Sequence, residues 1–200
     1  ICCGRLRQSS RGRNRPRPLH NIRVAQGNLR DLFFAGQQER MCAMAVIYEA
    51  MDSKTVRAIR AGGPDAYGQP AQRGAISDGQ GVPCRHCLKD VPSGREYLIL
   101  AHRPFPELQP YAETGPIFLC ADDCERGGGG ELPAILTTSP DYLLKGYRAD
   151  DRIFYGTGRV VPAAGISDYA GGLLDDPAVA YVDVRSARNN CFQLRIRRAG

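Results

Sequence analysis

Residues 180–196 read AYVDVRSARNNCFQLRI, and this stretch decides the fold of the 200-residue chain. Apolar and polar residues alternate on both sides of residues 187–190, which is typical of two β-strands with one face in a core. The pattern predicts a hairpin that buries Val182, Val184, Phe192, Leu194 and Ile196. The other face is predicted to display polar groups, as cross-strand pairs or as a binding surface: Tyr181, Asp183, Arg185, Cys191, Gln193 and Arg195.

The preceding segments extend this sheet. Residues 142–147 and 152–161 flank a run of turn-forming residues and predict a second hairpin. Between the two hairpins, Ile166, Ala170, Leu173 and Leu174 follow helical spacing, and Pro177 ends the predicted helix. Gly171 and Gly172 weaken this helix, so we expect packing to hold it.

The first half of the domain gives shorter signals. We expect a strand over residues 45–48, a helix over residues 54–61 capped by Asp52 or Ser53, and an edge strand over residues 74–77. Residues 96–102 predict a central strand covered on both sides, residues 117–119 predict another, and residues 127–130 predict a flexible glycine connector. The chain is therefore predicted to contain one α+β domain over residues 44–200, mainly an antiparallel sheet with two or three short helices.

The charge of the chain lies in its first 40 residues. The net charge is +6 and the isoelectric point is near 9.0. Nine arginines and only two acidic residues precede position 41, whereas the remainder has 18 basic and 19 acidic residues, a net charge of −1. A near-neutral domain lacks the basic footprint of a nucleic-acid-binding protein, so nucleic acid is an expected partner only for the tail.

Residues 1–43 have no apolar periodicity and predict a disordered, arginine-rich tail. Two interpretations remain open: an arm that binds RNA, DNA or acidic lipid, or upstream sequence translated from a wrong start, with Met41 and Met44 as candidate initiators. We favour the second. The longest apolar run, residues 97–101, is far shorter than a membrane span, so we expect a soluble, cytoplasmic protein without membrane partners.

Two cysteine pairs have the spacing of metal half-sites. Cys84 and Cys87 enclose two residues, and Cys120 and Cys124 enclose three. Four soft thiolates in two close pairs favour tetrahedral zinc, with His86 and Cys191 as reserve ligands. The alternatives are reduced cysteines without metal, or redox chemistry at Cys84 and Cys87, which the proline at position 92 disfavours because it leaves no room for a helix.

Several segments resemble the family known as domain of unknown function 1203. They are residues 83–88 (PCRHCL), 101–105 (AHRPF), 110–118 (PYAETGPIF), 155–158 (YGTG), 176–182 (DPAVAYV) and 184–191 (VRSARNNC). The resemblance covers about residue 45 to the C-terminus and implies a bacterial host, but it implies no activity. Relatives carry a Cys-x-x-Cys pair near the C-terminus, where this chain has Cys191 followed by Leu194.

Polar residues collect at the ends of the predicted strands, where binding sites are usually built. His102, Glu113 and Cys191 are candidate catalytic residues. The candidate ligand-binding residues are Arg103, Tyr111, Arg185, Asn189 and Asn190. We expect a binding or accessory module with a structural zinc; the alternative is a small enzyme of unknown reaction that brings His102, Arg103, Glu113, Arg185 and Cys191 into one pocket.

Overall fold

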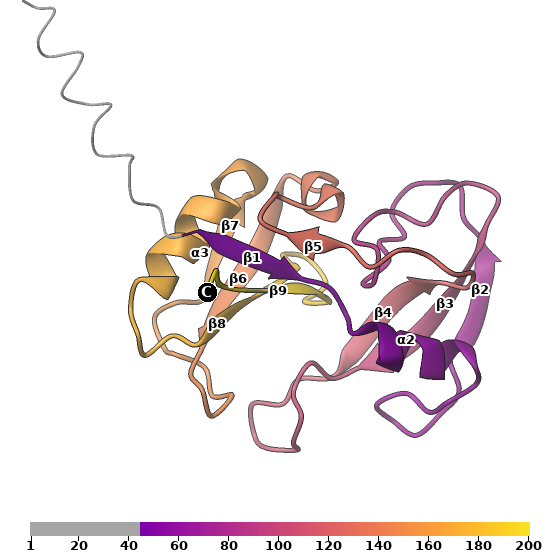
Figure 1. Cartoon of the computed structure of the whole chain (residues 1–200), viewed down its shortest axis with the longest axis horizontal. Coiled ribbons are helices and arrows are strands. Elements are labelled where there is room, and N and C mark those ends of the chain that lie inside the picture. The colour runs from indigo at the N-terminus through magenta and orange to yellow at the C-terminus, as the bar shows by residue number, and fades with distance from the viewer. Residues whose placement is uncertain (1–44) are drawn as a thin grey trace, which may run out of the picture. The chain divides into compact units, whose positions relative to one another are not determined.

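The computed structural model describes residues 45–200, whose strands form two antiparallel sheets (Figure 1). The predicted α+β class, with mainly antiparallel strands and short helices, is confirmed, but the strands divide between two sheets rather than forming one. The predicted tail, residues 1–43, lies outside the described residues. Within residues 45–200, no helix has the length and hydropathy that crossing a membrane requires.

The larger sheet joins the two ends of the domain. Its six strands follow the order β5-β1-β9-β8-β6-β7. The first strand pairs with the last, with Tyr48 opposite Ile196, so residues 148 positions apart in the chain are neighbours. The strands are β1 (Val46–Glu49), β5 (Gly128–Gly129), β6 (Asp141–Tyr147), β7 (Arg159–Pro162), β8 (Tyr181–Ser186) and β9 (Phe192–Arg198).

Helix α3 (Ile166–Leu174) packs on the larger sheet, as the helical spacing predicts. Ile166, Ala170 and Leu174 are fully buried and share a core with Val184 and Leu194. Since two glycines lower the intrinsic stability of this helix, these apolar contacts hold it in place. The 3-10 helices η1 (Ala134–Thr137) and η2 (Ala163–Gly165) complete the helical elements beside this sheet.

The smaller sheet has the order β2-β3-β4 and packs against α2 (Ser53–Arg60). Its strands are β2 (Gln72–Ile76), β3 (Glu96–His102) and β4 (Gly115–Cys120). The Asp52 carboxylate accepts a hydrogen bond from Thr55 N at 2.9 Å, which confirms the predicted helix cap. β3 is central as predicted, but only its Leu98 and Leu100 face is fully buried.

A bulge that the alternation does not reveal interrupts the confirmed β8–β9 hairpin. Val184 pairs with Leu194, whereas Arg185 pairs with Phe192, so Gln193 is an extra residue in β9. A bulge reorients the side chains beyond it. Phe192 therefore packs in the core of the smaller sheet, while Leu194 packs in the core of the larger one. The prediction that both residues share one face is wrong for Phe192.

The face of the hairpin that was predicted to be displayed is covered instead. The exposed fractions are 2% for Tyr181, 0% for Asp183, 3% for Arg185 and 5% for Gln193. The connection between β3 and β4 lies over this face, because Arg195 Nη2 donates to Pro104 O at 3.0 Å and Phe105 packs beside Tyr181. Period-two alternation cannot show that a distant connection covers a polar face, and the prediction of a wet surface is wrong for this reason.

The second predicted hairpin is confirmed with a shorter return strand. β6 pairs with β7 from Asp141 opposite Pro162 to Leu144 opposite Arg159. Residues 148–158 connect these strands, and an isolated bridge between Tyr147 and Ile153 holds the start of the connection. Strand β6 also pairs with β8, so the two predicted hairpins lie side by side.

Two of the glycines at 127–130, Gly127 and Gly128, are closely packed, so the segment is not simply a flexible connector. A Cβ atom on Gly127 would lie 2.4 Å from Cys87 O, and one on Gly128 would lie 2.4 Å from Tyr48 O. Gly128 also has a φ angle of 111°, which side-chain-bearing residues rarely adopt. Glycine at positions 127 and 128 therefore lets this segment approach both the turn at Cys87 and β1.

Replacing Gly128 by alanine is expected to lower the free energy of unfolding by roughly 2 kcal/mol or more, since the new Cβ meets backbone and the φ angle is unfavourable. Urea unfolding measures the effect. Gly130→Ala is the matched control, because its new Cβ has Val46 O at 3.9 Å as its closest atom. Equal losses in the two variants would show that close packing of β5 does not matter.

Candidate metal centre

The first cysteine pair lies in a tight turn between β2 and β3. Leu88 N donates to Cys84 O at 3.0 Å, and Cys84 N donates to Lys89 O at 2.9 Å. The chain reverses at Leu88, whose φ angle of 56° is left-handed. The turn therefore holds the side chains of Cys84 and Cys87 close together.

The second pair follows the end of β4. Cys120 is the last residue of that strand, and Cys124 lies in the loop after it. A parallel bridge joins Cys84 to Phe118, and Arg85 N donates to Phe118 O at 3.1 Å. These backbone contacts place the turn of the first pair along the strand that carries the second pair.

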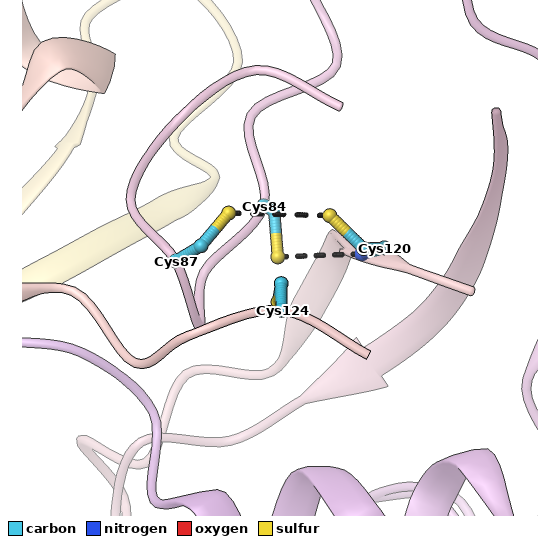
Figure 2. A group of neighbouring side chains, drawn as sticks. All are labelled: Cys84, Cys87, Cys120 and Cys124. Atoms are coloured by element: carbon cyan, nitrogen blue, oxygen red, sulfur yellow. Dashed lines mark hydrogen bonds between the residues drawn. The ribbon is translucent and has the colours of Figure 1, made fainter. Parts of the chain in front are cut away.

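Sulfur atoms from all four cysteines meet in one place, between the turn and the segment after β4 (Figure 2). The four Sγ atoms lie within 4.8 Å of one another, and Sγ of Cys87 is 3.9 Å from Sγ of Cys120. A tetrahedron with metal–sulfur distances of about 2.3 Å has edges of about 3.8 Å, whereas a disulfide bond is about 2.05 Å long. The spacing therefore fits a shared metal ion and not a disulfide.

Hydrogen-bond donors surround the sulfurs. Cys120 N donates to Sγ of Cys84 at 3.3 Å, and Arg60 Nη2 donates to Sγ of Cys124 at 3.1 Å. His86 Nδ1 lies 3.2 Å from Sγ of Cys124, and its Nε2 lies 2.9 Å from Ser53 Oγ. His86, a predicted reserve ligand, thus contacts the Cys124 sulfur rather than joining the group. Donors such as Cys120 N and Arg60 Nη2 orient the sulfurs and stabilise negative charge on them.

Charge within the cluster is unevenly distributed without a cation. Hydrogen bonds with Cys120 and Cys87 lower the pKa of Cys84 below that of an ordinary thiol. Hydrogen bonds with Cys84 and Cys87, followed by burial, raise the pKa of Cys120. One thiolate is therefore favoured and further deprotonation is opposed by burial and by the first negative charge. A divalent cation would remove this opposition because it compensates the added charges.

His102 and Arg103 line a pocket of about 590 Å³ beside α2 and Phe192. Burial, followed by the charges of Arg85, Arg195 and Arg185, lowers the pKa of His102 to about 4. The imidazole is therefore neutral at pH 7. Arg103 Nε donates to Phe105 O at 3.1 Å, which fixes the connection after β3.

Glu113 lies in a separate cluster of charges. Its Oε1 accepts from Lys145 Nζ at 2.8 Å, and its Oε2 lies 2.8 Å from Arg185 Nη2, an ion pair without good hydrogen-bond geometry. Asn190 Nδ2 donates to Oε1 at 3.5 Å, and its backbone oxygen accepts from Arg185 Nη1 at 3.1 Å. Three of the candidate residues, Glu113, Arg185 and Asn190, are thus brought together.

The remaining candidates lie elsewhere. The hydroxyl groups of Tyr111 and Tyr155 are 3.1 Å apart at the surface. Asn189 and Cys191 line another pocket, of about 640 Å³, between the two sheets. Cys191 is not one of the four clustered cysteines. The residues nominated for one catalytic pocket therefore occupy three places.

The Glu113 cluster predicts a pH dependence of stability. Burial raises the pKa of Glu113, but the hydrogen bond from Lys145 and the charges of Arg185 and Lys145 outweigh it and leave the pKa lowered. A lowered folded-state pKa adds stability above the unfolded value of about 4.3, and this stability disappears as the pH falls through the folded value.

Glu113→Gln is expected to lower the unfolding free energy by about 1–2 kcal/mol at pH 7 and by less near pH 3, because the contribution of the carboxylate is lost as the pH falls through its lowered pKa. Urea unfolding at both values checks this, with the exposed Glu107→Gln as control. A loss that is the same at both pH values would show that the charge of Glu113 is not stabilising.

Sequence patterns miss several residues around these sites. Arg60 contacts Cys124 from the last turn of α2. Arg85, which lies between Cys84 and Cys87 in the sequence, is almost fully buried. An arginine at the end of a helix is ordinary, so nothing local signals that it contacts a sulfur 64 positions away. The one sequence signal for Arg85 was its position inside the Cys84–Cys87 turn, because a residue in a fixed turn has fixed neighbours.

Fold and site together define an α+β domain with two antiparallel sheets and a four-cysteine centre at the end of the smaller one. Residues 81–198 match the family described as Protein of unknown function (DUF1203), and the chain belongs to this family. The matched region contains all four clustered cysteines and Cys191, whereas β1 and α2 precede it. Comparison with curated proteins and with solved structures gave no match.

Proposed function

We propose that this domain is a binding or accessory module whose smaller sheet is held by a structural zinc ion bound to Cys84, Cys87, Cys120 and Cys124. The observation that carries the proposal is the convergence of four thiol sulfurs within 4.8 Å. Thiolates are soft ligands that prefer zinc to magnesium or calcium. Two pairs, each held by its own backbone, suit the tetrahedral geometry of zinc.

A structural role follows from the ligand set. Catalytic zinc sites keep one position open for water or substrate, whereas sites with four cysteines are closed. Zinc here would tie the turn at Cys84 to the end of β4. The same turn also reaches the larger sheet, because Arg85 Nε donates to Phe192 O at 2.7 Å. The metal would thereby stabilise the junction between the sheets.

The placement of the other candidates supports a module over an enzyme. An enzyme needs its acid, base and nucleophile around one reacting atom. His102, Glu113 and Cys191 are instead divided between a pocket, an ion-pair cluster and a second pocket.

Cobalt substitution tests the proposal. Metal-free protein titrated with Co²⁺ should develop the visible bands of tetrahedral cobalt and the near-ultraviolet bands of thiolate coordination, saturating at one ion per chain. Zinc should then displace cobalt and abolish both. Six-coordinate spectra, or saturation at no defined ratio, would refute the four-thiolate site.

The variant Cys191→Ser is the matched control for this titration, since it removes a thiol outside the cluster. It should bind cobalt as the wild type does, whereas Cys124→Ser should lose the spectrum of four-thiolate coordination. Identical spectra from both variants would mean that the metal is held elsewhere.

A further inference from the structure

The pocket that contains Cys191 lies between the sheets and has a volume of about 640 Å³, a size typical of small-molecule sites. Arg85 from the cysteine turn, Asp90 after it, and Gln193 from the bulge of β9 line it together with Phe118. None of these residues belongs to the four-cysteine group. The pocket is thus a site of its own.

Arg85 brings a buried positive charge to this pocket. Its side chain is 2% exposed, and its guanidinium carbon lies 5.8 Å from the centre of the Phe118 ring. Nε donates to Phe192 O and Nη1 donates to Pro83 O. Among residues 45–200, Nη2 has no acceptor. A buried guanidinium with one free nitrogen is suited to a carboxylate.

The pocket also offers unused acceptors. Asp90 Oδ1 is buried and has no hydrogen-bond donor within the described part of the chain. Gln193 Nε2 donates to Cys191 O at 3.2 Å, and its Oε1 takes no hydrogen bond from residues 45–200. Leaving a buried carboxylate oxygen such as Asp90 Oδ1 unpaired costs about 1–3 kcal/mol, so a donor from a ligand would be stabilising. An ammonium group supplies three donors.

The thiol of Cys191 lies at the same pocket and is partly exposed. Its Sγ is 3.7 Å from Asn189 O. Arg85 and Cys191 line the same pocket, so the thiol and the guanidinium face a common cavity.

We propose that this pocket binds a small zwitterionic disulfide, with its carboxylate on Arg85 and its ammonium on Asp90 and Gln193, and presents it to the thiol of Cys191. The pocket has a positive donor, Arg85, and a negative acceptor, Asp90, beside the accessible thiol of Cys191. This combination favours a zwitterionic disulfide over a simple anion or an apolar molecule. The site would carry a reversible mixed disulfide.

The reaction is a thiol–disulfide exchange. The thiolate of Cys191 attacks one ligand sulfur, a new sulfur–sulfur bond forms, and the ligand's own sulfur–sulfur bond breaks. The departing half of the ligand leaves as a thiolate and takes the proton that Cys191 released. Cys191 is oxidised and the departing half is reduced, so the ligand itself is the oxidant.

Selectivity between disulfides tests the proposal on the full chain. Cystine is the zwitterionic probe, and bis(2-hydroxyethyl) disulfide is the neutral one. Rates are followed by alkylation and mass spectrometry of the tryptic peptide 189–195, which contains no cysteine other than Cys191. Relative to N-acetylcysteine as reference thiol, Cys191 should prefer cystine over the neutral disulfide by about tenfold or more, the effect expected of charged hydrogen bonds.

The variant Asp90→Asn should lose most of this preference. Asp150→Asn is the matched control, because Asp150 is exposed in the turn after β6 and does not line the pocket. A wild-type preference equal to that of the reference thiol would overturn the proposal and leave Cys191 an ordinary exposed thiol. So would an Asp90→Asn variant that retains the preference. Peptide 189–195 contains none of the four clustered cysteines, so reactions of those thiols do not enter the measurement.

Discussion

Replacing Cys120 by serine is expected to abolish stoichiometric zinc binding and to lower the unfolding free energy by about 3–5 kcal/mol, as loss of a structural metal does. Cys120 is 6% exposed, and its sulfur is 3.9 Å from that of Cys87. Serine differs by one atom, so the loss of packing is small and loss of the metal dominates. Thermal unfolding should shift by about 10 °C or more.

Chelation separates metal loss from simple damage to the fold. A strong chelator should lower the unfolding temperature of the wild type and of Cys191→Ser, but it should leave Cys120→Ser unchanged because that variant has no metal to lose. Cys191→Ser itself should shift the unfolding free energy by less than about 0.5 kcal/mol. Chelator effects of equal size in all three proteins would contradict a role of Cys120 in metal binding.

Arg195→Met is expected to have an effect of similar size, about 3–5 kcal/mol, because it leaves a buried carboxylate without its partner. Arg195 Nε lies 2.7 Å from Asp183 Oδ1, and Nη2 lies 3.1 Å from Oδ2. Asp183 is fully buried, and the guanidinium carbon of Arg195 lies 3.5 Å from the centre of the Tyr181 ring. Methionine retains most of the apolar stem of arginine, so the loss of unfolding free energy reports mainly the removal of the positive charge. Urea unfolding measures it.

The loss of unfolding free energy in Arg195→Met should depend on pH. Burial raises the pKa of Asp183, although Arg195 opposes this. Without Arg195 the folded-state pKa rises further, and stability is then lost as the pH rises through that value. Arg195→Met should therefore be more damaging at pH 8 than at pH 5. Arg197→Met is the control, because Arg197 and its partner Glu49 are both partly exposed and such pairs contribute less than about 1 kcal/mol. Equal losses in both variants would rule out a special role for the buried pair.

Local spacing predicted the four clustered cysteines and most of the elements, because both depend on residues close in the chain. Cys84 and Cys87, and likewise Cys120 and Cys124, are brought together by a turn and by a strand end. Likewise, the cross-strand pair of Asp183 and Arg195 follows from alternation in a hairpin.

The errors arise where distant segments meet. The bulge at Gln193 moved Phe192 to the second core, and the connection after β3 covered a face that alternation predicted to be wet. Neither event leaves a local pattern, since each depends on how two sheets pack together. For the same reason the sequence could not show that Arg85 and Cys191, 106 positions apart, line one pocket.

Zinc K-edge X-ray absorption of the protein, purified without chelator, tests the central claim most directly. One zinc ion per chain with four sulfur neighbours at about 2.3 Å is the predicted result. A shell that contains nitrogen or oxygen, or a purified protein with no stoichiometric metal, would contradict it.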